Sequence, residues 1–268
     1  MKYKLLVLDI DGTVTNSQKQ VTKRTRDAVI RLQEQGVAVV IASGRAPRGV
    51  LPIAKALQLH RAGSYILAFN GARIIHCQSR KCIFEKQLPR HIPARLWQDA
   101  KAHQLGILTY SDQVLIAGTP PDPYMAIESR ISHMPVEYHP DFLPALQNPV
   151  NGCLLTGDPE IIEAMEPFFV RKHFHETQIF RSEPFFLEVA PKNVDKAYSL
   201  KHLLGILGIR REEMVCCGDS FNDITMIQLA GLGVAMANGQ QMLKDVANYV
   251  TCNDNDHDGI AEVIETFF

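Results

Sequence analysis

Two aspartates, Asp9 and Asp11, follow directly on an apolar run in the stretch LLVLDIDGT, from Leu5 to Thr13. On an extended chain, residues two apart point to the same side, so these two carboxylates can face one pocket. They are not expected to be core residues, because a buried unpaired charge is very costly. Two acids that face one pocket predict a site for a divalent cation such as Mg2+, or an acid and nucleophile pair.

A second pair of acids follows another apolar run. Met214–Cys217 is expected to form a buried strand, and Asp219 and Asp223 come just after it. Residues four apart can approach one centre from the first turn of a helix, here one that begins near Ser220. Asp223 could instead be a helix-start carboxylate that the helix dipole favours. Both pairs stand where strands of an open α/β sheet end, which is where such sheets bind ligands.

Ser43, Gly44 and Lys196 suit an anionic ligand. The first two follow a predicted strand at Val37–Ala42 and precede a predicted helix that begins at Pro47. A hydroxyl and backbone N–H groups at such a place can bind phosphate oxygens, although an ordinary N-cap serine would also fit. Lys196 lies in the first turn of a predicted helix, where the dipole does not favour a cation. An anionic ligand would account for it, and the alternative is a solvated lysine.

Apolar strands alternate with helical patterns on both sides of a central stretch, which predicts an α/β fold with a mainly parallel sheet. The expected strands of this sheet are Leu5–Leu8, Val37–Ala42, Tyr65–Phe69, Phe186–Ala190, Met214–Cys217 and Leu232–Met236, with a short one at Tyr249–Thr251. Asn70 and Gly71 follow the third of these strands, where Asn-Gly commonly makes a tight turn.

The central stretch has a different composition. Prolines become frequent after Leu88, and the strand and helix alternation breaks down. Helices are expected at about 93–103 and 159–171, with short strands at about 107–110, 114–117, 153–156 and 178–181. Segregated strands and helices of this kind predict a separate α+β unit at 86–186.

Bulk properties exclude several classes of protein. The 268 residues carry a net charge of −1, so no basic surface argues for nucleic acid. Six cysteines without a disulfide or zinc spacing are typical of reduced thiols in a cytoplasmic protein. The start of the chain has too few apolar residues for a signal peptide, and no stretch is long and apolar enough to span a membrane.

The chain carries four short motifs in this order: DxDGT at Asp9, SGR at Ser43, the lone Lys196 and GDSFND at Gly218. Their order and spacing match the four motifs of the haloacid dehalogenase (HAD) superfamily, which the chain therefore resembles. NGA at Asn70, GVAMANG at Gly233 and the segment Asn253–Gly259 extend the likeness to its Cof-type branch. One departure is Ala197, where the family usually has glycine; we expect it to alter helix packing slightly without abolishing function.

This resemblance implies a Rossmann-like HAD core, formed by residues 1–85 and 187–268, with an inserted α/β cap at 86–186 that sets substrate specificity. It also implies that Asp9 is the nucleophile and that Asp11 is the acid and base. Mg2+ would be held by Asp9, the backbone carbonyl of Asp11 and Asp219, with Asp223 nearby or coordinating through water. The expected phosphate-binding residues are Ile10 (through its amide), Ser43, Gly44, Lys196 and Asn222. The expected residues at the substrate edge are Arg45, Asn70 and Gly71.

The function that the resemblance implies is Mg2+-dependent hydrolysis of small phosphomonoesters, such as sugar phosphates, through an aspartyl-phosphate. A phosphotransferase or phosphomutase would share the same motifs. A non-catalytic module that binds Mg2+ and phosphate is a third possibility, but mere binding does not need both Asp9 and Asp11. The expected partner is a small phosphorylated metabolite, with neither nucleic acid nor membrane, and the chain is expected to be a monomer or a weak homo-oligomer.

Overall fold

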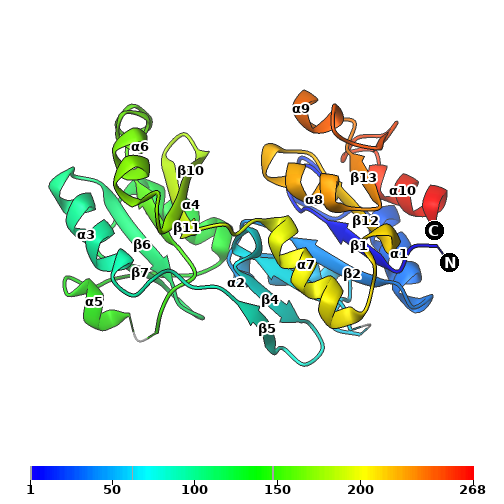
Figure 1. Ribbon diagram of the computed structural model, residues 1–268, viewed down its shortest axis with the longest axis horizontal. Helices are drawn as coiled ribbons and strands as arrows, with labels where there is room; N and C mark the ends of the chain where they lie inside the picture. Colours follow the sequence, from blue (N-terminus) through cyan, green and yellow to red (C-terminus); the bar gives the residue numbers. More distant parts are fainter. Residues whose placement is uncertain (1, 62, 147) are drawn as a thin grey trace. The chain divides into compact units, whose positions relative to one another are not determined.

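The computed structural model of the protein describes residues 2–61, 63–146 and 148–268, so that Met1, Ala62 and Gln147 lie outside the described residues. The chain divides into two compact units, each with its own sheet (Figure 1). The first unit comprises Met1–Gly44, Val50–Phe84 and Asp195–Phe268, and the second comprises Arg45–Gly49 and Glu85–Val194.

The first unit is built on an eight-stranded sheet with the order β14-β13-β12-β1-β2-β3-β4-β5. In that order its strands are Tyr249–Val250, Leu232–Ala235, Met214–Gly218, Leu5–Leu8, Ala38–Ala42, Tyr65–Ala68, Arg73–His76 and Cys82–Glu85. The strands from β14 to β3 pair in parallel, and β4 turns back antiparallel to β3. The predicted α/β fold with a mainly parallel core sheet is therefore confirmed.

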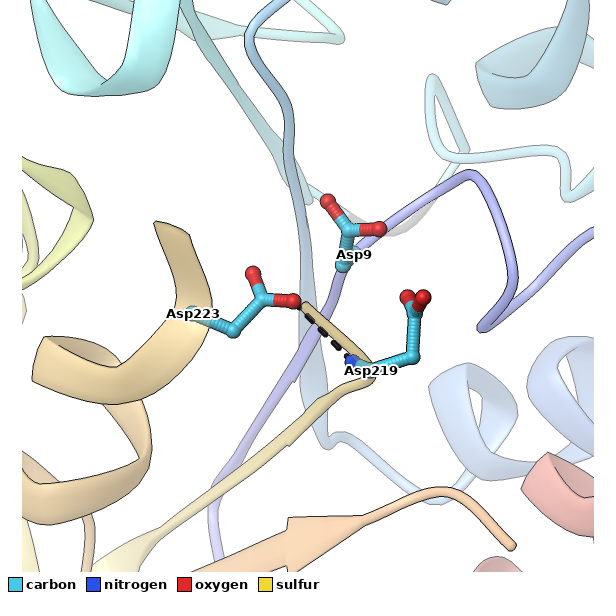
Figure 2. A group of neighbouring side chains, drawn as sticks. All are labelled: Asp9, Asp219 and Asp223. Carbon is cyan, nitrogen blue, oxygen red and sulfur yellow. Dashed lines mark hydrogen bonds between the residues drawn. The ribbon is translucent and has the colours of Figure 1, made fainter. Parts of the chain in front are cut away.

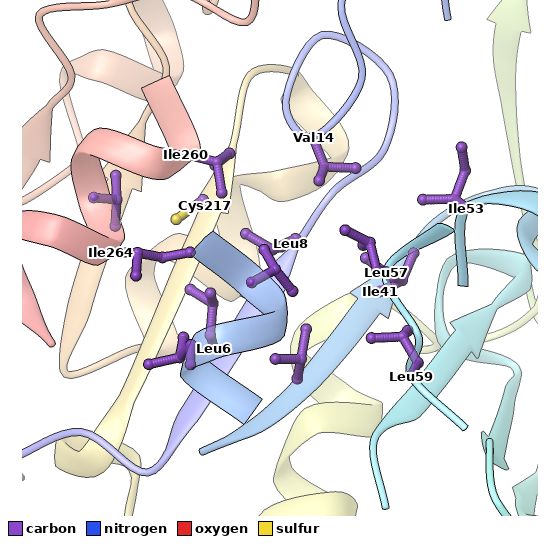
Figure 3. Packing of buried hydrophobic residues seen from close by; sticks show 14 of the residues in the cluster. Leu6, Leu8, Val14, Ile41, Ile53, Leu57, Leu59, Cys217, Ile260 and Ile264 are labelled. Carbon is purple, nitrogen blue, oxygen red and sulfur yellow. The ribbon is translucent and has the colours of Figure 1, made fainter. Parts of the chain in front are cut away.

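Both faces of this sheet are covered, which explains why β1 is apolar at every position. Leu6 and Leu8 point into one hydrophobic cluster, and Leu5 and Val7 into another on the opposite face. Figure 3 shows the first cluster, in which Leu6 and Leu8 lie close to residues of the last helix. The helices of the unit are α1 (Lys23–Glu34), α2 (Pro47–Ala56, of which residues 50–56 belong to this unit), α7 (Lys196–Leu207), α8 (Ile224–Leu229), α9 (Gln241–Lys244) and α10 (Gly259–Phe267).

Helix α7 has defined ends, and its start matters for the site. The Asp195 carboxylate accepts a hydrogen bond from the Tyr198 amide at 2.6 Å, which is the geometry of an N-cap. Gly208 ends the helix in the left-handed region at φ +64°. Lys196 is therefore held at the first helical position by its own cap.

The second unit contains a six-stranded sheet with the order β10-β11-β9-β6-β7-β8. In that order its strands are Thr177–Glu183, Phe186–Pro191, Cys153–Thr156, Gly106–Tyr110, Leu115–Ala117 and Val136–Tyr138. Its pairs are antiparallel except for β7 with β8. The helices are α3 (Ile92–Ala102), α4 (Pro123–Ser132), α5 (Phe142–Ala145) and α6 (Pro159–His173).

One strand was assigned to the wrong sheet by the sequence. Phe186–Ala190, which we expected in the core sheet, forms β11 and pairs with β9 and β10 of the second unit. Its side chains alternate: Leu187 and Val189 enter the apolar core of the second unit, and Glu188 lies between them on the other face. Such alternation is typical of an antiparallel strand with one polar face, not of a strand buried on both faces.

The helices in the described part of the chain include none that is both long enough and apolar enough to cross a membrane.

Candidate active site

Acids from both ends of the chain meet where β1 and β12 end. These strands are parallel neighbours with Leu8 opposite Cys217, and the Asp9 amide donates to the Cys217 carbonyl at 3.1 Å. Asp9 and Asp219 therefore emerge side by side. Carboxylate oxygens of Asp9, Asp219 and Asp223 lie within 4.8 Å of one another. Figure 2 shows the three side chains grouped together.

The ammonium group of Lys196 lies between two of these acids. Its Nζ is 2.5 Å from Asp9 Oδ1 and 2.6 Å from Asp223 Oδ1, and the side chain is fully buried. The alternative of a solvated lysine is wrong. Because α7 begins at this residue, the N-cap of α7 fixes where the ammonium stands.

Asp223 and Asp219 are oriented by further hydrogen bonds. Asp223 Oδ2 accepts from the amides of Asp219 at 3.0 Å and Ser220 at 3.1 Å, and this holds the loop that precedes α8. Asp219 Oδ1 accepts from the Thr13 hydroxyl at 2.8 Å. The orienting role of Thr13 was missed by sequence reasoning, although the residue belongs to the DxDGT motif.

The cluster holds more negative than positive charge, since three carboxylates face one ammonium group. Burial, with the neighbouring charges of Asp223 and Asp219, raises the pKa of Asp9 to about 8 even though Lys196 opposes the shift. Burial also raises the pKa of Asp219 to about 6. Burial would lower the pKa of Lys196, but the two carboxylates outweigh it and hold that pKa above its usual value. Such a cluster of acids attracts a cation, and its oxygen donors suit a hard ion such as Mg2+.

Asp11 lies outside this cluster of three acids. Its side chain is 38% exposed, and its Oδ1 is 2.8 Å from the Nζ of Lys19. An accessible carboxyl beside a buried acid cluster can exchange protons with ligand or water. The backbone carbonyl of Asp11 as a metal ligand stays a prediction.

The predicted anion-binding residues gather at the ends of β2 and β3 and in the loop after β12. The Asn70 amide donates to the Ser43 carbonyl at 3.0 Å, and Asn222 Nδ2 donates to Asn70 Oδ1 at 3.2 Å. A Cβ added at Gly44 would lie 3.1 Å from Asn70 Nδ2. The Ile10 side chain is fully buried, so its backbone is the part that can reach a ligand.

Gly71 and Arg45, expected at the substrate edge, have other contacts in the structure. Gly71 is buried at φ +107°, and a Cβ there would come within 2.5 Å of the Asp195 carbonyl oxygen, so glycine permits close approach to the start of α7. Arg45 belongs to the second unit, where Nη1 donates to the Gly49 carbonyl at 3.3 Å. Contact of either residue with substrate stays a prediction.

Replacement of Gly12 by alanine should destabilise the protein through this site. Gly12 has φ +78°, and a Cβ would lie 2.5 Å from Asp219 Oδ2. We expect the left-handed backbone conformation to lower the free energy of unfolding by about 1–3 kcal/mol. The displacement of Asp219 should lower it further. The control is Gly208→Ala, where φ is +64° and no heavy atom lies within 4 Å of the added Cβ. Urea unfolding measures the stability of both variants. An equal loss of unfolding free energy in the two would contradict the packing of Gly12 against Asp219.

The chain belongs to the haloacid dehalogenase-like hydrolases, whose family model matches residues 6–264. It is similar over its whole length to a haloacid dehalogenase-like hydrolase from Bacteroides thetaiotaomicron, with a TM-score of 0.95, 41% identity and coverage of 99% of this chain and 100% of that one. It is also similar to TM0651 from Thermotoga maritima, with a TM-score of 0.88, 27% identity and coverage of 99% and 98%.

Among curated proteins, the 5-amino-6-(5-phospho-D-ribitylamino)uracil phosphatase YcsE of Bacillus subtilis (strain 168) is 29% identical over 263 residues, which cover 97% of this chain and 94% of the relative. The protein is thus a HAD-superfamily phosphatase of the Cof type, a phosphoric monoester hydrolase, as the motifs predicted.

Proposed function

We propose that the protein is a Mg2+-dependent phosphatase of small phosphomonoesters that works through an aspartyl-phosphate on Asp9. The observation that carries this proposal is the convergence of Asp9, Asp219 and Asp223 on one point, with the Lys196 ammonium 2.5 Å from Asp9. A nucleophile, charge-neutralising groups and a cation-binding pocket are what phosphoryl transfer requires.

The proposed cation site is formed by Asp9, the backbone carbonyl of Asp11 and Asp219, with Asp223 binding directly or through water. When bound, Mg2+ supplies positive charge that offsets the repulsion between a carboxylate and a phosphate dianion. The geometry favours binding through water for Asp223, because both of its oxygens already accept hydrogen bonds, from Lys196 and from two backbone amides.

The chemistry of the chain's own residues then has two steps. In the first, a carboxylate oxygen of Asp9 bonds to phosphorus, the bond from phosphorus to the leaving oxygen breaks, and Asp11 gives that oxygen a proton. In the second, Asp11 takes a proton from water, whose oxygen attacks phosphorus and releases Asp9 and inorganic phosphate. Lys196 stays charged throughout and offsets negative charge on the phosphoryl oxygens.

The phosphoryl oxygens would be bound by Lys196, Asn222, the Ser43 hydroxyl and the amides of Gly44 and Ile10. Support comes from the contacts that bring Ser43, Gly44 and Asn222 around Asn70. Fixed donors of this kind cost no reorganisation during the reaction.

We also propose that the second unit is the inserted cap that selects the leaving group. It has a sheet and an apolar core of its own, as an independent specificity unit requires. The related YcsE is named for a phosphorylated ribityl compound, which supports a small hydroxylated phosphomonoester as the substrate class for this chain. Sugar phosphates are the compounds to test first.

Phosphate release from a panel of phosphorylated metabolites tests this function. We expect release that requires Mg2+, falls by about 100-fold or more in EDTA and returns when Mg2+ is restored. Turnover that is indifferent to EDTA would contradict the cation site. Transfer of the phosphoryl group to a second sugar, with a bisphosphate formed and no free phosphate, would instead make the protein a phosphotransferase or mutase.

A further inference from the structure

The turn that carries Asp11 is closed on itself at the end of β1. The Ile10 carbonyl accepts hydrogen bonds from the amides of Val14 at 3.1 Å and Thr15 at 3.0 Å, and from the Thr15 hydroxyl at 2.9 Å. Asp11 and Thr15 also form an isolated β-bridge. Because the turn is this compact, a shift of its backbone would carry the Asp11 carboxyl with it.

Two asparagine side chains from the other end of the chain hold this turn. Asn238 lies in the loop between β13 and α9, and its Nδ2 donates to the Gly12 carbonyl at 2.8 Å. Asn255 lies before α10, and its Nδ2 donates to the Thr15 carbonyl at 2.9 Å. The Asn255 amide donates to Asn238 Oδ1 at 3.0 Å. The two asparagines therefore form one connected set of hydrogen bonds that reaches the turn at two points.

The orientation of both side-chain amides follows from their partners. A backbone N–H can only donate, and a backbone carbonyl can only accept. Asn238 must present its oxygen to the Asn255 amide, which leaves its NH2 group for the Gly12 carbonyl. Asn255 must present its NH2 group to the Thr15 carbonyl. An aspartate at either place would set a carboxylate against a carbonyl oxygen, so both contacts require an amide.

The loop that carries Asn238 is also fixed against the acid cluster. The Gln240 amide donates to the Asp219 carbonyl at 2.8 Å. A Cβ added at Gly239 would lie 3.2 Å from the same carbonyl oxygen, so the two backbones are in close contact there. Since Asn238 precedes Gly239 in the chain, its side chain links the backbone of Asp219 to the turn of Asp11.

A purely structural role accounts poorly for the contacts of Asn238. Its side chain is exposed, and hydrogen bonds that water can replace add little to stability. The loop before α10 has other anchors, since Asp256 Oδ1 accepts from the amide of Ser17 at 2.8 Å and from its hydroxyl at 2.9 Å. Glu262 Oε2 accepts from the Asn253 amide at 2.9 Å. The loop is thus attached without Asn238, whose own contribution is the position of the turn.

We propose that Asn238 and Asn255 are positioning residues that hold the Asp11 carboxyl where it can protonate the leaving oxygen. This inference rests on the proposed function, in which Asp11 gives up its proton as the bond from phosphorus to that oxygen breaks. General acid catalysis depends strongly on the geometry of the proton transfer. Loss of the Asn238 amide releases the Gly12 carbonyl and lets the turn move. A reaction whose leaving group needs a proton should then suffer most.

Phenyl phosphate and p-nitrophenyl phosphate distinguish the two situations. p-Nitrophenolate can leave without a proton, whereas phenolate is a much stronger base and needs one from Asp11. For both compounds, kcat/KM reports the step in which the phosphoryl group is transferred to the enzyme. We expect Asn238→Ala to lower kcat/KM for phenyl phosphate about tenfold more than for p-nitrophenyl phosphate. Asn255→Ala keeps its backbone amide and should show a smaller preferential loss.

Asp11→Asn is the reference variant, because it removes the acid itself. It should show the same preferential loss with phenyl phosphate, and Asn238→Ala should add no further preference in the Asp11→Asn background. The control Gln35→Ala removes an exposed side-chain amide of the same unit and should leave both kcat/KM values unchanged.

Equal losses with the two compounds in Asn238→Ala would overturn the inference, because a general loss of structure or of cation binding lowers both values alike. A further preference in the double variant would overturn it too. Either result, with a preferential loss in Asp11→Asn, leaves the proposed function standing. If Asp11→Asn shows no preference, or the wild type releases no phosphate from either compound with Mg2+, the proposed function is itself wrong and this inference falls with it.

Discussion

Asp9→Asn loses at least about 10⁴-fold in kcat for phosphomonoester hydrolysis, because an amide cannot attack phosphorus. The protein should remain folded. Burial raises the pKa of Asp9, so the ionised carboxylate is unfavourable at this position and a neutral side chain of the same shape removes that cost. Phosphate release with saturating Mg2+ measures the loss, and circular dichroism checks the fold.

Asp141→Asn is the matched control for this substitution. Asp141 is exposed, and its side chain makes no hydrogen bond at the start of α5. The same substitution at this position should leave kcat within about twofold of the wild-type value. Surface substitutions away from buried or hydrogen-bonded groups have small effects. A turnover in Asp9→Asn that matches this control would refute the nucleophile assignment.

Lys196→Met loses both stability and turnover. The substitution leaves Asp9 and Asp223 buried without their cation, and breaking a buried pair in this way costs about 3–5 kcal/mol. Urea unfolding in EDTA at pH 8 measures the loss. The loss should be smaller at pH 5.5, because the Asp9 carboxylate, whose pKa burial already raises, can then take up a proton.

Lys201→Met provides the control on the same helix. Lys201 is exposed on α7, so its replacement should change the free energy of unfolding by less than about 0.5 kcal/mol and leave turnover intact. Equal stability of the two variants would mean that the Lys196 ammonium does not hold the acids together.

The sequence predicted the core sheet because its signals are local. Strands such as Leu5–Leu8 are apolar throughout since both faces are covered, and the acids at their ends are conspicuous for the same reason. The strand at Phe186 was misassigned because Glu188 was read as part of a buried run, whereas its sheet is set by distant partners on β9 and β10.

Helix α4 was missed because Pro120, Pro121 and Pro123 indicate a break. In the structure, Pro123 occupies the first turn, where a missing N–H costs nothing, and Asp122 caps the helix through the amides of Tyr124 and Met125. Proline marks the start of this helix, not an interruption, and residue counts alone do not distinguish the two cases.

For the site, the sequence predicted which residues take part but not how they pair. It predicted Lys196 as a ligand for anions, and the structure adds its bridge between Asp9 and Asp223. The bond from Thr13 to Asp219 joins residues that are 206 positions apart, a proximity that spacing cannot show. The membership of Arg45 in the second unit likewise depends on packing against α4 and not on its neighbours in sequence.

Trapping the phosphoryl-enzyme tests the central claim most directly. The enzyme is mixed with substrate and Mg2+, quenched in acid within one turnover, digested and analysed by mass spectrometry. The account predicts one added phosphoryl group on the peptide that contains Asp9, and none in Asp9→Asn. A phosphoryl group on another residue, or burst kinetics of phosphate release that persist in Asp9→Asn, would contradict it.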